Sequence, residues 1–143
     1  MMRMTDSRNV TISLEGFNEL DGEPTVATHR AIHHYKNGIH YVRYEEKQDD
    51  KIVRNMIKIN ETRIEVMKKG YINSKMVFEE GKKHTNDYHT PYGLMKMTVH
   101  TKKMNIDESD MAIVVELDYN LAVDEQHISK CSIKINIKNE MSD

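Results

Sequence analysis

Alternation of apolar and polar residues with a period of two is the feature that most constrains how this sequence folds. In the clearest stretch, residues 111–123, every second residue is apolar, while Glu116 and Asp118 lie among the residues between them. Residues 95–102 alternate in the same way. Successive side chains of a strand point to opposite faces, so this pattern predicts strands with one buried face. Because no segment shows the period of a helix, we expect an all-β protein.

A hairpin is predicted around Asn37-Gly38, because this pair readily adopts the positive φ angles of a type I′ turn. The turn joins residues 26–36 to residues 39–46. Its two-residue length fixes the register of the strands, which predicts these opposed pairs: Tyr35 with His40, His33 with Val42, Ala31 with Tyr44, His29 with Glu46, and Arg30 with Glu45. Apolar and polar residues are mixed on both faces, so the sequence leaves open which face points inward.

Similar alternating runs, separated by short turn-rich connections, predict eight to ten strands in all. The other features expected are strands at residues 10–14, 53–59, 64–66, 72–78, 95–101, 111–123 and 128–137, a turn at Lys69-Gly70, a type I turn at Thr90-Pro91-Tyr92-Gly93, a connection at residues 105–110, and a bulge between Ile128 and Cys131. Residues 82–89 are expected to lead into the strand that follows them.

Consecutive strands with short connections pair antiparallel, and closing such a sheet removes its exposed edges. We therefore expect a single closed antiparallel up-and-down β-barrel of eight to ten strands, with a two-sheet sandwich as the alternative. One domain is expected over residues 1–143, with frayed ends at residues 1–8 and 139–143.

Charge and cysteine content argue against several classes of partner and site. The formal net charge is −2 with both signs interspersed, so the chain lacks the basic field that binds a nucleic-acid backbone. Cys131 is the only cysteine, which excludes an intramolecular disulfide and a thiolate zinc cluster and indicates a reducing cytoplasm. The N-terminal residues lack the apolar core of a secretory signal, and no apolar run reaches the ~20 residues of a membrane span. We expect a cytoplasmic protein that binds neither nucleic acid nor membrane.

Residue types used in catalysis and metal binding are present, but without the spacing of a recognised site. The four histidines that crowd one hairpin fit half-exposed strand positions as well as they fit a metal site, and they are His29, His33, His34 and His40. Cys131 shares a strand face with isoleucines, which predicts a buried, inert thiol. Glu45 with a histidine is the best candidate for an acid/base pair. We expect no catalytic residue, no metal and no cofactor, and an enzyme ranks below two binding functions.

A barrel of this size either fills with side chains or holds one small ligand. The methionines expected to point inward, which fit core packing better than a pocket, are Met76, Met95, Met97 and Met111. The candidate ligand-binding residues are Arg43, Tyr44, Glu45, Tyr88 and Tyr92. The leading hypothesis is a barrel that binds a small molecule in or at its mouth. The alternative is a protein-interaction module or homodimer that uses an outer sheet face, so both a monomer and a homodimer are open.

Three segments of the chain resemble the DUF1934 family of small bacterial proteins. They are Tyr41-Val42-Arg43-Tyr44-Glu45-Glu46, residues 67–70, and Tyr88-His89-Thr90-Pro91-Tyr92-Gly93 with the alternating strand that follows it. The similarity in order and spacing runs over nearly the whole chain. It implies a calycin-like, lipocalin-like closed barrel in a bacterial cytoplasm, and it implies no activity. Calycin barrels commonly bind small apolar ligands, which favours the leading hypothesis by analogy of fold alone.

Overall fold

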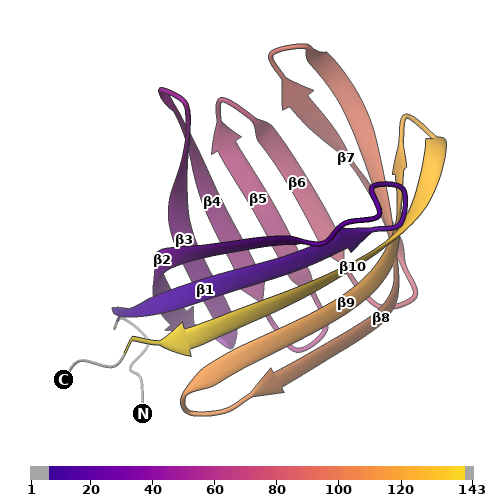
Figure 1. Ribbon diagram of the computed structural model, residues 1–143. Coiled ribbons are helices and arrows are strands. Elements are labelled where there is room, and N and C mark those ends of the chain that lie inside the picture. Colours follow the sequence, from indigo (N-terminus) through magenta and orange to yellow (C-terminus); the bar gives the residue numbers. More distant parts are fainter. Residues whose placement is uncertain (1–6, 141–143) are drawn as a thin grey trace.

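Ten strands form a closed antiparallel barrel in the computed structural model, which describes residues 7–140 (Figure 1). The strands are β1 (Ser7–Asn18), β2 (Thr25–Lys36), β3 (Ile39–Gln48), β4 (Lys51–Ile59), β5 (Ile64–Gly70), β6 (Asn73–Phe78), β7 (Lys83–Thr90), β8 (Gly93–Glu108), β9 (Ala112–Val123) and β10 (Gln126–Asn139). Each strand pairs with its neighbour in sequence, and β10 pairs with β1 to close the barrel. The predicted up-and-down barrel is confirmed, and the alternative of a two-sheet sandwich is wrong.

The hairpin between β2 and β3 forms as predicted near its turn. Asn37 and Gly38 have φ angles of 52° and 79°, both positive as a type I′ turn requires. The ladder beyond the turn contains two of the predicted pairs, Tyr35 with His40 and His33 with Val42.

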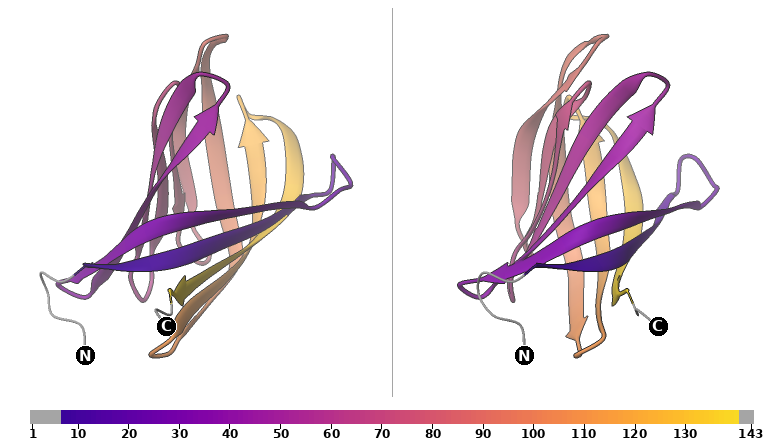
Figure 2. Two further views of the ribbon diagram at one scale, coloured as in Figure 1. Left: turned by 60° about the vertical axis from the view of Figure 1, so that its left-hand side comes forward. Right: turned by 90° about the vertical axis from the view of Figure 1, so that its left-hand side faces the viewer.

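Beyond Ile32 and Arg43 the two strands of this hairpin diverge. β2 follows β1 back to Thr25, whereas β3 follows β4 to Gln48, and Figure 2 shows β1 and β2 running together across the other strands. Three predicted pairs are therefore wrong, namely Ala31 with Tyr44, His29 with Glu46, and Arg30 with Glu45. The space that opens between residues 25–31 of β2 and residues 44–48 of β3 is called here the β2–β3 gap.

β8 is longer than the sequence predicted, because a bulge changes the phase of its alternation. The register against β9 shifts just after Thr101, and beyond this point Met104 and Ile106 pack against the core. The connection predicted at residues 105–110 is wrong, since β8 continues to Glu108.

Two further features of the sheet are the strand β7 and a bulge in β10. Residues 82–89, expected to lead into the next strand, form most of β7, which pairs with β8 along its whole length. In β10 the register shifts between Gln126 and Ser129, next to the bulge predicted between Ile128 and Cys131.

Apolar side chains from the inward faces fill the barrel toward the end that carries the Asn37-Gly38 turn. The members of this core with 0% exposure are Val10, Ile12, Val42, Ile57, Ile64, Val115 and Ile135. Phe78 packs edge-on against Tyr119, with ring centroids 5.0 Å apart. Each such side chain stabilises the fold by roughly 1.5–3 kcal/mol through its removal from water.

The cysteine and two of the methionines test the predicted inward positions directly. Cys131 is buried, as its isoleucine neighbours predicted. Met97 is also buried, at 8% exposure, and confirms its predicted position. Met111 is 51% exposed because it precedes β9 instead of belonging to it, so its predicted inward position is wrong.

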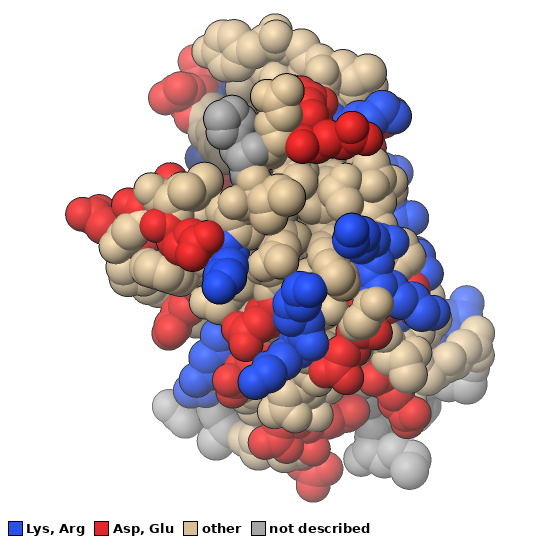
Figure 3. Space-filling model, turned by 90° about the vertical axis from the view of Figure 1, so that its right-hand side faces the viewer, with Lys and Arg blue, Asp and Glu red and all other residues tan. Residues whose placement is uncertain are grey.

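The ends of the described chain lie beside each other on β1 and β10. Ser7 and Arg8 pair with β2, and Asn139 pairs with Val10, whereas residues 1–6 and 141–143 of the predicted frayed ends lie outside the described residues. No helix that is long and apolar enough to cross a membrane occurs between residues 7 and 140. On the side that is to the right in Figure 1, basic and acidic side chains are interspersed (Figure 3).

Candidate functional site

Five polar or tyrosine side chains form a row across the inner surface of β3 to β7. Register places neighbours of the row directly opposite each other on adjacent strands, in the order Tyr44, Asn55, Lys68, Ser74 and Tyr88. Opposed residues of antiparallel strands project to the same face of the sheet. The burial of Tyr44 at 7% and Asn55 at 3% shows that this face is the inner one. These five residues are called here the polar row.

The polar row lies directly above the apolar core. Two residues further along β3 and β4, toward the Asn37-Gly38 end, Val42 and Ile57 are completely buried in the core. On β5 and β6 the corresponding positions are Val66 and Met76, which are partly buried and pack against it. The row therefore borders the apolar core on the side of the Asn37-Gly38 turn, and beyond it, toward the β3–β4 and β5–β6 turns, Val53 of β4 is also completely buried.

Two members of the row, Asn55 and Lys68, form a closed set of hydrogen bonds with Glu46. Lys68 Nζ donates to Glu46 Oε1 and to Asn55 Oδ1, both at 2.8 Å, and Asn55 Nδ2 donates to the same Glu46 oxygen at 2.9 Å. The side chains of Lys68 and Glu46 keep 33% and 22% of their surface exposed, so this set is reached by solvent. We call these three residues the Lys68 triangle.

Burial and hydrogen bonding act in opposite directions on the Glu46 carboxyl. Burial raises its pKa, but the hydrogen bond and charge of Lys68, together with the Asn55 amide, outweigh burial and leave the pKa below its usual value. At neutral pH the inner surface therefore presents an ionised carboxylate beside an ammonium group.

Tyr44 meets His29 from β2 on the inside of the β2–β3 gap. Their rings are stacked, with centroids 4.7 Å apart and an angle of 23° between the planes. Burial raises the pKa of Tyr44 well above that of an ordinary tyrosine, and the charge of Glu46 raises it further. The hydroxyl stays neutral at physiological pH and remains a hydrogen-bond donor.

The five predicted ligand-binding residues lie on different surfaces. Tyr44 and Tyr88 belong to the polar row on the inside of the barrel. Arg43 and Glu45 flank Tyr44 in sequence and point outward, because successive strand residues alternate between the two faces. Tyr92 is 96% exposed in the turn between β7 and β8. Two of the five thus lie at opposite ends of the polar row with three strands between them, and two lie side by side on the outer surface.

Four residues at this site were not predicted from the sequence, namely Asn55, Lys68, Ser74 and Glu46. A signal was present, because Asn55 occupies the same alternation phase as Val53 and Ile57, where an apolar residue is expected. A polar residue in the apolar phase of a strand indicates either a buried hydrogen-bond network or a site.

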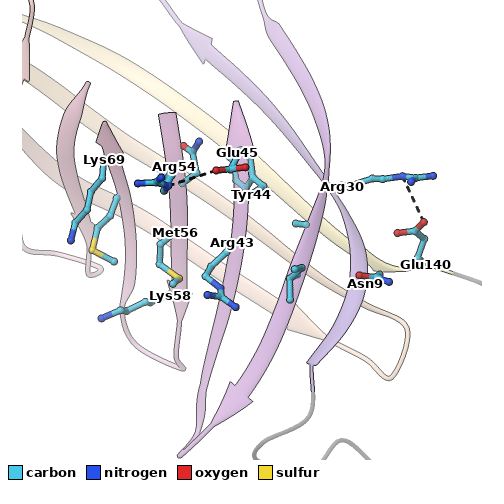
Figure 4. A pocket seen from close by; sticks show the side chains of 14 residues that line it. Asn9, Arg30, Arg43, Tyr44, Glu45, Arg54, Met56, Lys58, Lys69 and Glu140 are labelled. Atoms are coloured by element: carbon cyan, nitrogen blue, oxygen red, sulfur yellow. Dashed lines mark ion pairs between the residues drawn. The ribbon is translucent and has the colours of Figure 1, made fainter. Parts of the chain in front are cut away.

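Arg43 and Glu45 line a groove of about 1000 Å³ on the outer surface of β2 to β5 (Figure 4). In Figure 4, Arg43, Met56 and Lys58 lie side by side on the near face of β3 and β4. Glu45 pairs with Arg54 at 3.6 Å, and not with Arg30 as the sequence suggested. We call this surface the basic groove, because Lys and Arg outnumber Glu among its lining residues, which include Arg30, Arg43, Arg54, Lys58, Lys69, Glu45 and Glu140.

Two of the histidines on the β2–β3 hairpin, His33 and His40, form a buried pair. Arg8 Nε donates to His33 Nδ1 at 3.2 Å, which leaves the His33 Nε2–H to donate to His40 Nδ1 at 2.9 Å. His40 Nε2 lies 2.9 Å from a Glu108 oxygen and donates to it. This chain of hydrogen bonds fixes one tautomer for each ring. Within residues 7–140, no three His, Cys, Asp or Glu side chains converge as metal ligands do.

Cys131 lacks the setting of a reactive thiol. Burial raises its pKa above the usual value, and hydrogen bonds from Ser129 and Tyr119 offset only part of this effect. Ser129 Oγ lies 3.7 Å from the sulfur. The thiol therefore stays protonated and packs as a small apolar side chain.

Sequence and structure comparisons agree on one group of relatives. A family model described as a domain of unknown function (DUF1934) matches residues 11–135. The uncharacterized β-barrel protein YwiB of Bacillus subtilis (strain 168) is 23% identical over 134 residues, which cover 91% of this chain and 94% of that protein. The crystal structure of the ywiB protein from Bacillus subtilis matches with a TM-score of 0.79 and 20% identity, over 94% of each chain.

Proposed function

The chain belongs to the DUF1934 family, and from this premise we propose that it is a non-enzymatic barrel that binds a small molecule over its polar row. The ligand enters from the end of the barrel opposite the apolar core. This proposal rests on the polar row and not on the family, whose members share the fold.

The observation that carries the proposal is the replacement of core by hydrogen-bonding groups across five consecutive strands. A barrel that only fills its interior places apolar side chains at such inward positions. Here Lys68 supplies a donor, Glu46 supplies acceptors, Asn55 holds both in place, and Ser74 and Tyr88 add hydroxyl groups. The set is partly exposed, so a ligand replaces water there and not protein atoms.

The surroundings of the row define the chemical class of the ligand. Beneath it, partly buried apolar side chains border the core, including Val66, Met76, Leu14 and Leu121. A molecule with an apolar body and a hydrogen-bonding head fits both surfaces, with the head at the Lys68 triangle. The triangle pairs one positive with one negative charge, which favours a neutral or zwitterionic head.

The proposal includes a cytoplasmic location, which is supported by the protonated, buried thiol of the only cysteine. Cell fractionation of the native host, with an antibody to the untagged protein, tests this part. Recovery of the protein from the extracellular or membrane fraction contradicts it.

Native mass spectrometry of gently purified full-length protein tests ligand binding and subunit number together. We expect an additional mass of a small molecule on the wild-type chain, which is lost in Lys68→Met because the head group loses its donor. Lys83→Met is the matched control, since Lys83 is exposed on β7. A wild-type chain that carries no small molecule, and whose melting temperature no amphipathic compound raises, contradicts the proposal. So does equal binding by the Lys68 and Lys83 variants.

A further inference from the structure

The β2–β3 gap leaves two strand edges without a partner inside the part of the chain that the structure describes. The ladder between these strands ends at Ile32 with Arg43, although β3 continues to Gln48. Residues 44–48 of β3 pair with β4 on one side only, and residues 25–31 of β2 pair with β1 on one side only. Figure 2 shows how far β2 turns away from β3 beyond their shared turn.

An unpaired strand edge presents a row of backbone N–H and C=O groups that accept another extended segment. Glu45, Glu46 and Lys47 are charged, as is common at edges that must avoid aggregation. The edge is continuous with the basic groove, because Arg43, Tyr44 and Glu45 of β3 line that groove.

The basic groove carries a net positive charge, although the whole protein carries a net negative charge. Five of its lining residues are Lys or Arg and two are Glu, whereas the chain has a formal net charge of −2. Both glutamates are in weak pairs: Arg54 and Glu45 are 3.6 Å apart with side chains 76% and 64% exposed, and Arg30 and Glu140 are 3.8 Å apart.

Three cations of the groove lack a carboxylate partner among residues 7–140. Arg43 contacts the His34 ring at 2.7 Å, and Lys58 lies over the Tyr41 ring at 5.7 Å from its centroid, while Lys69 has neither contact. By contrast, both signs are interspersed on the side of the barrel that Figure 3 shows. An anionic partner therefore finds uncompensated positive charge at the groove and not on that side.

Apolar surface in the groove lies between the cations. Met56 and Met67 are half-buried on the outer faces of β4 and β5, and Ile32 of β2 is 43% exposed. Methionine adapts its shape to different partners. A segment that combines acidic and apolar side chains meets complementary surfaces in the same groove.

We propose that an extended acidic segment of another protein pairs with residues 44–48 of β3 and lays its acidic side chains over the basic groove. The unpaired backbone edge selects an extended polypeptide, and the cations select its charge. This site uses the backbone edge of residues 44–48 and side chains of the outer face, whereas the proposed small-molecule site uses the inward side chains of Tyr44 and Glu46 in the same segment.

Charge argues against a second copy of this chain as the occupant. The outward-facing residues of this edge are Arg43, Glu45 and Lys47, so a second copy paired along it would bring a further net positive charge to the basic groove. A nucleic acid satisfies the cations but makes no use of the strand edge.

Fluorescence anisotropy with a labelled short peptide that alternates glutamate and valine tests the proposal on the full chain. We expect saturable binding, about tenfold weaker for Arg43→Glu and unchanged for the matched charge reversal Lys83→Glu on β7. A peptide with lysine in place of glutamate should not bind. A glutamate peptide methylated on alternate backbone nitrogens should bind about tenfold more weakly, because it loses the hydrogen bonds to the edge.

Amide hydrogen exchange measured by mass spectrometry supplies the second readout. Binding of the glutamate peptide should slow exchange at residues 44–48 and leave β7 and β8 unchanged. Equal binding of the methylated peptide, or the absence of protection at residues 44–48, overturns the proposal. Two other outcomes also overturn the proposal. In one, the chain dimerises and the dimer no longer binds the peptide; in the other, a single-stranded oligonucleotide binds more tightly than the peptide and displaces it. In either case the groove has a different partner.

Discussion

Lowering the pH from about 7 to about 4.5 should destabilise the barrel through His33. Burial lowers the pKa of His33 to about 4, and the positive charges of His40 and Arg8 add to this effect. The ordinary value of 6.5 applies when the chain is unfolded. Between these two values the unfolded chain binds a proton that the folded chain does not, so the free energy of unfolding falls as the pH falls from 6.5 to 4.

The size of this effect follows from the difference between the two pKa values. One pKa unit corresponds to about 1.4 kcal/mol, so the full loss is roughly 3 kcal/mol. Most of it, roughly 2.5 kcal/mol, is already lost at pH 4.5. His33 is 1% exposed, so water does little to screen the cost of charging its ring. The Arg8 hydrogen bond to His33 Nδ1 is also lost when that nitrogen carries a proton.

Urea denaturation of the wild type and His33→Gln at several pH values tests this reasoning. Gln is suited to the position because its amide oxygen can accept from Arg8 and its amide nitrogen can donate to His40. The Gln amide itself does not titrate. Carboxylates titrate in both proteins, so the difference between the two unfolding free energies reports on the His33–His40 pair. As the pH falls from 7 to 4.5, the unfolding free energy of the variant should rise by roughly 2.5 kcal/mol relative to that of the wild type. The exposed His89→Gln serves as the control, and a difference that stays flat over this range refutes the argument.

The structure also sets the expected cost of four further substitutions. Lys68→Met should cost roughly 1–3 kcal/mol in urea denaturation, because Glu46 loses the partner that lowers its pKa, and a loss no larger than that of Lys83→Met contradicts this. Gly70→Ala should cost roughly 2 kcal/mol or more, since φ is 123° and a Cβ would lie 2.6 Å from a backbone oxygen. Gly22→Ala, at φ 74° with open space around it, should cost about 1 kcal/mol, and equal thermal shifts for the two glycine variants would refute the steric argument. Phe78→Ala should cost about 3–5 kcal/mol, and calorimetry that finds under 1 kcal/mol shows that the core does not depend on this ring.

The sequence was sufficient for the barrel and for the pairs nearest the Asn37-Gly38 turn, because turn chemistry and alternation are local. It was insufficient for the rest of that hairpin. β2 diverges from β3 because β2 stays paired with β1 while β3 stays paired with β4. The residues of the turn do not determine these other pairings. The bulge after Thr101 hid the end of β8 for a similar reason, since a fixed period of two cannot follow a change of phase.

The candidate site was predictable only in part. Tyr44 and Tyr88 were named from the sequence, but Asn55 and Lys68 join them only when four consecutive strand registers are known. A shift of one residue in any of these registers sends a side chain to the other face of the sheet. Arg43 and Glu45 illustrate this, because they are the sequence neighbours of Tyr44 and belong to another surface.

The ladder between β1 and β10 has a consequence for how the chain is made. All the other ladders join strands that follow each other in sequence, so each forms soon after its second strand leaves the ribosome. β1 pairs early with β2, but its other edge waits until β10 has been synthesised. Until then the sheet keeps an unpaired edge at β1, and an unpaired strand edge is a place where another chain can pair.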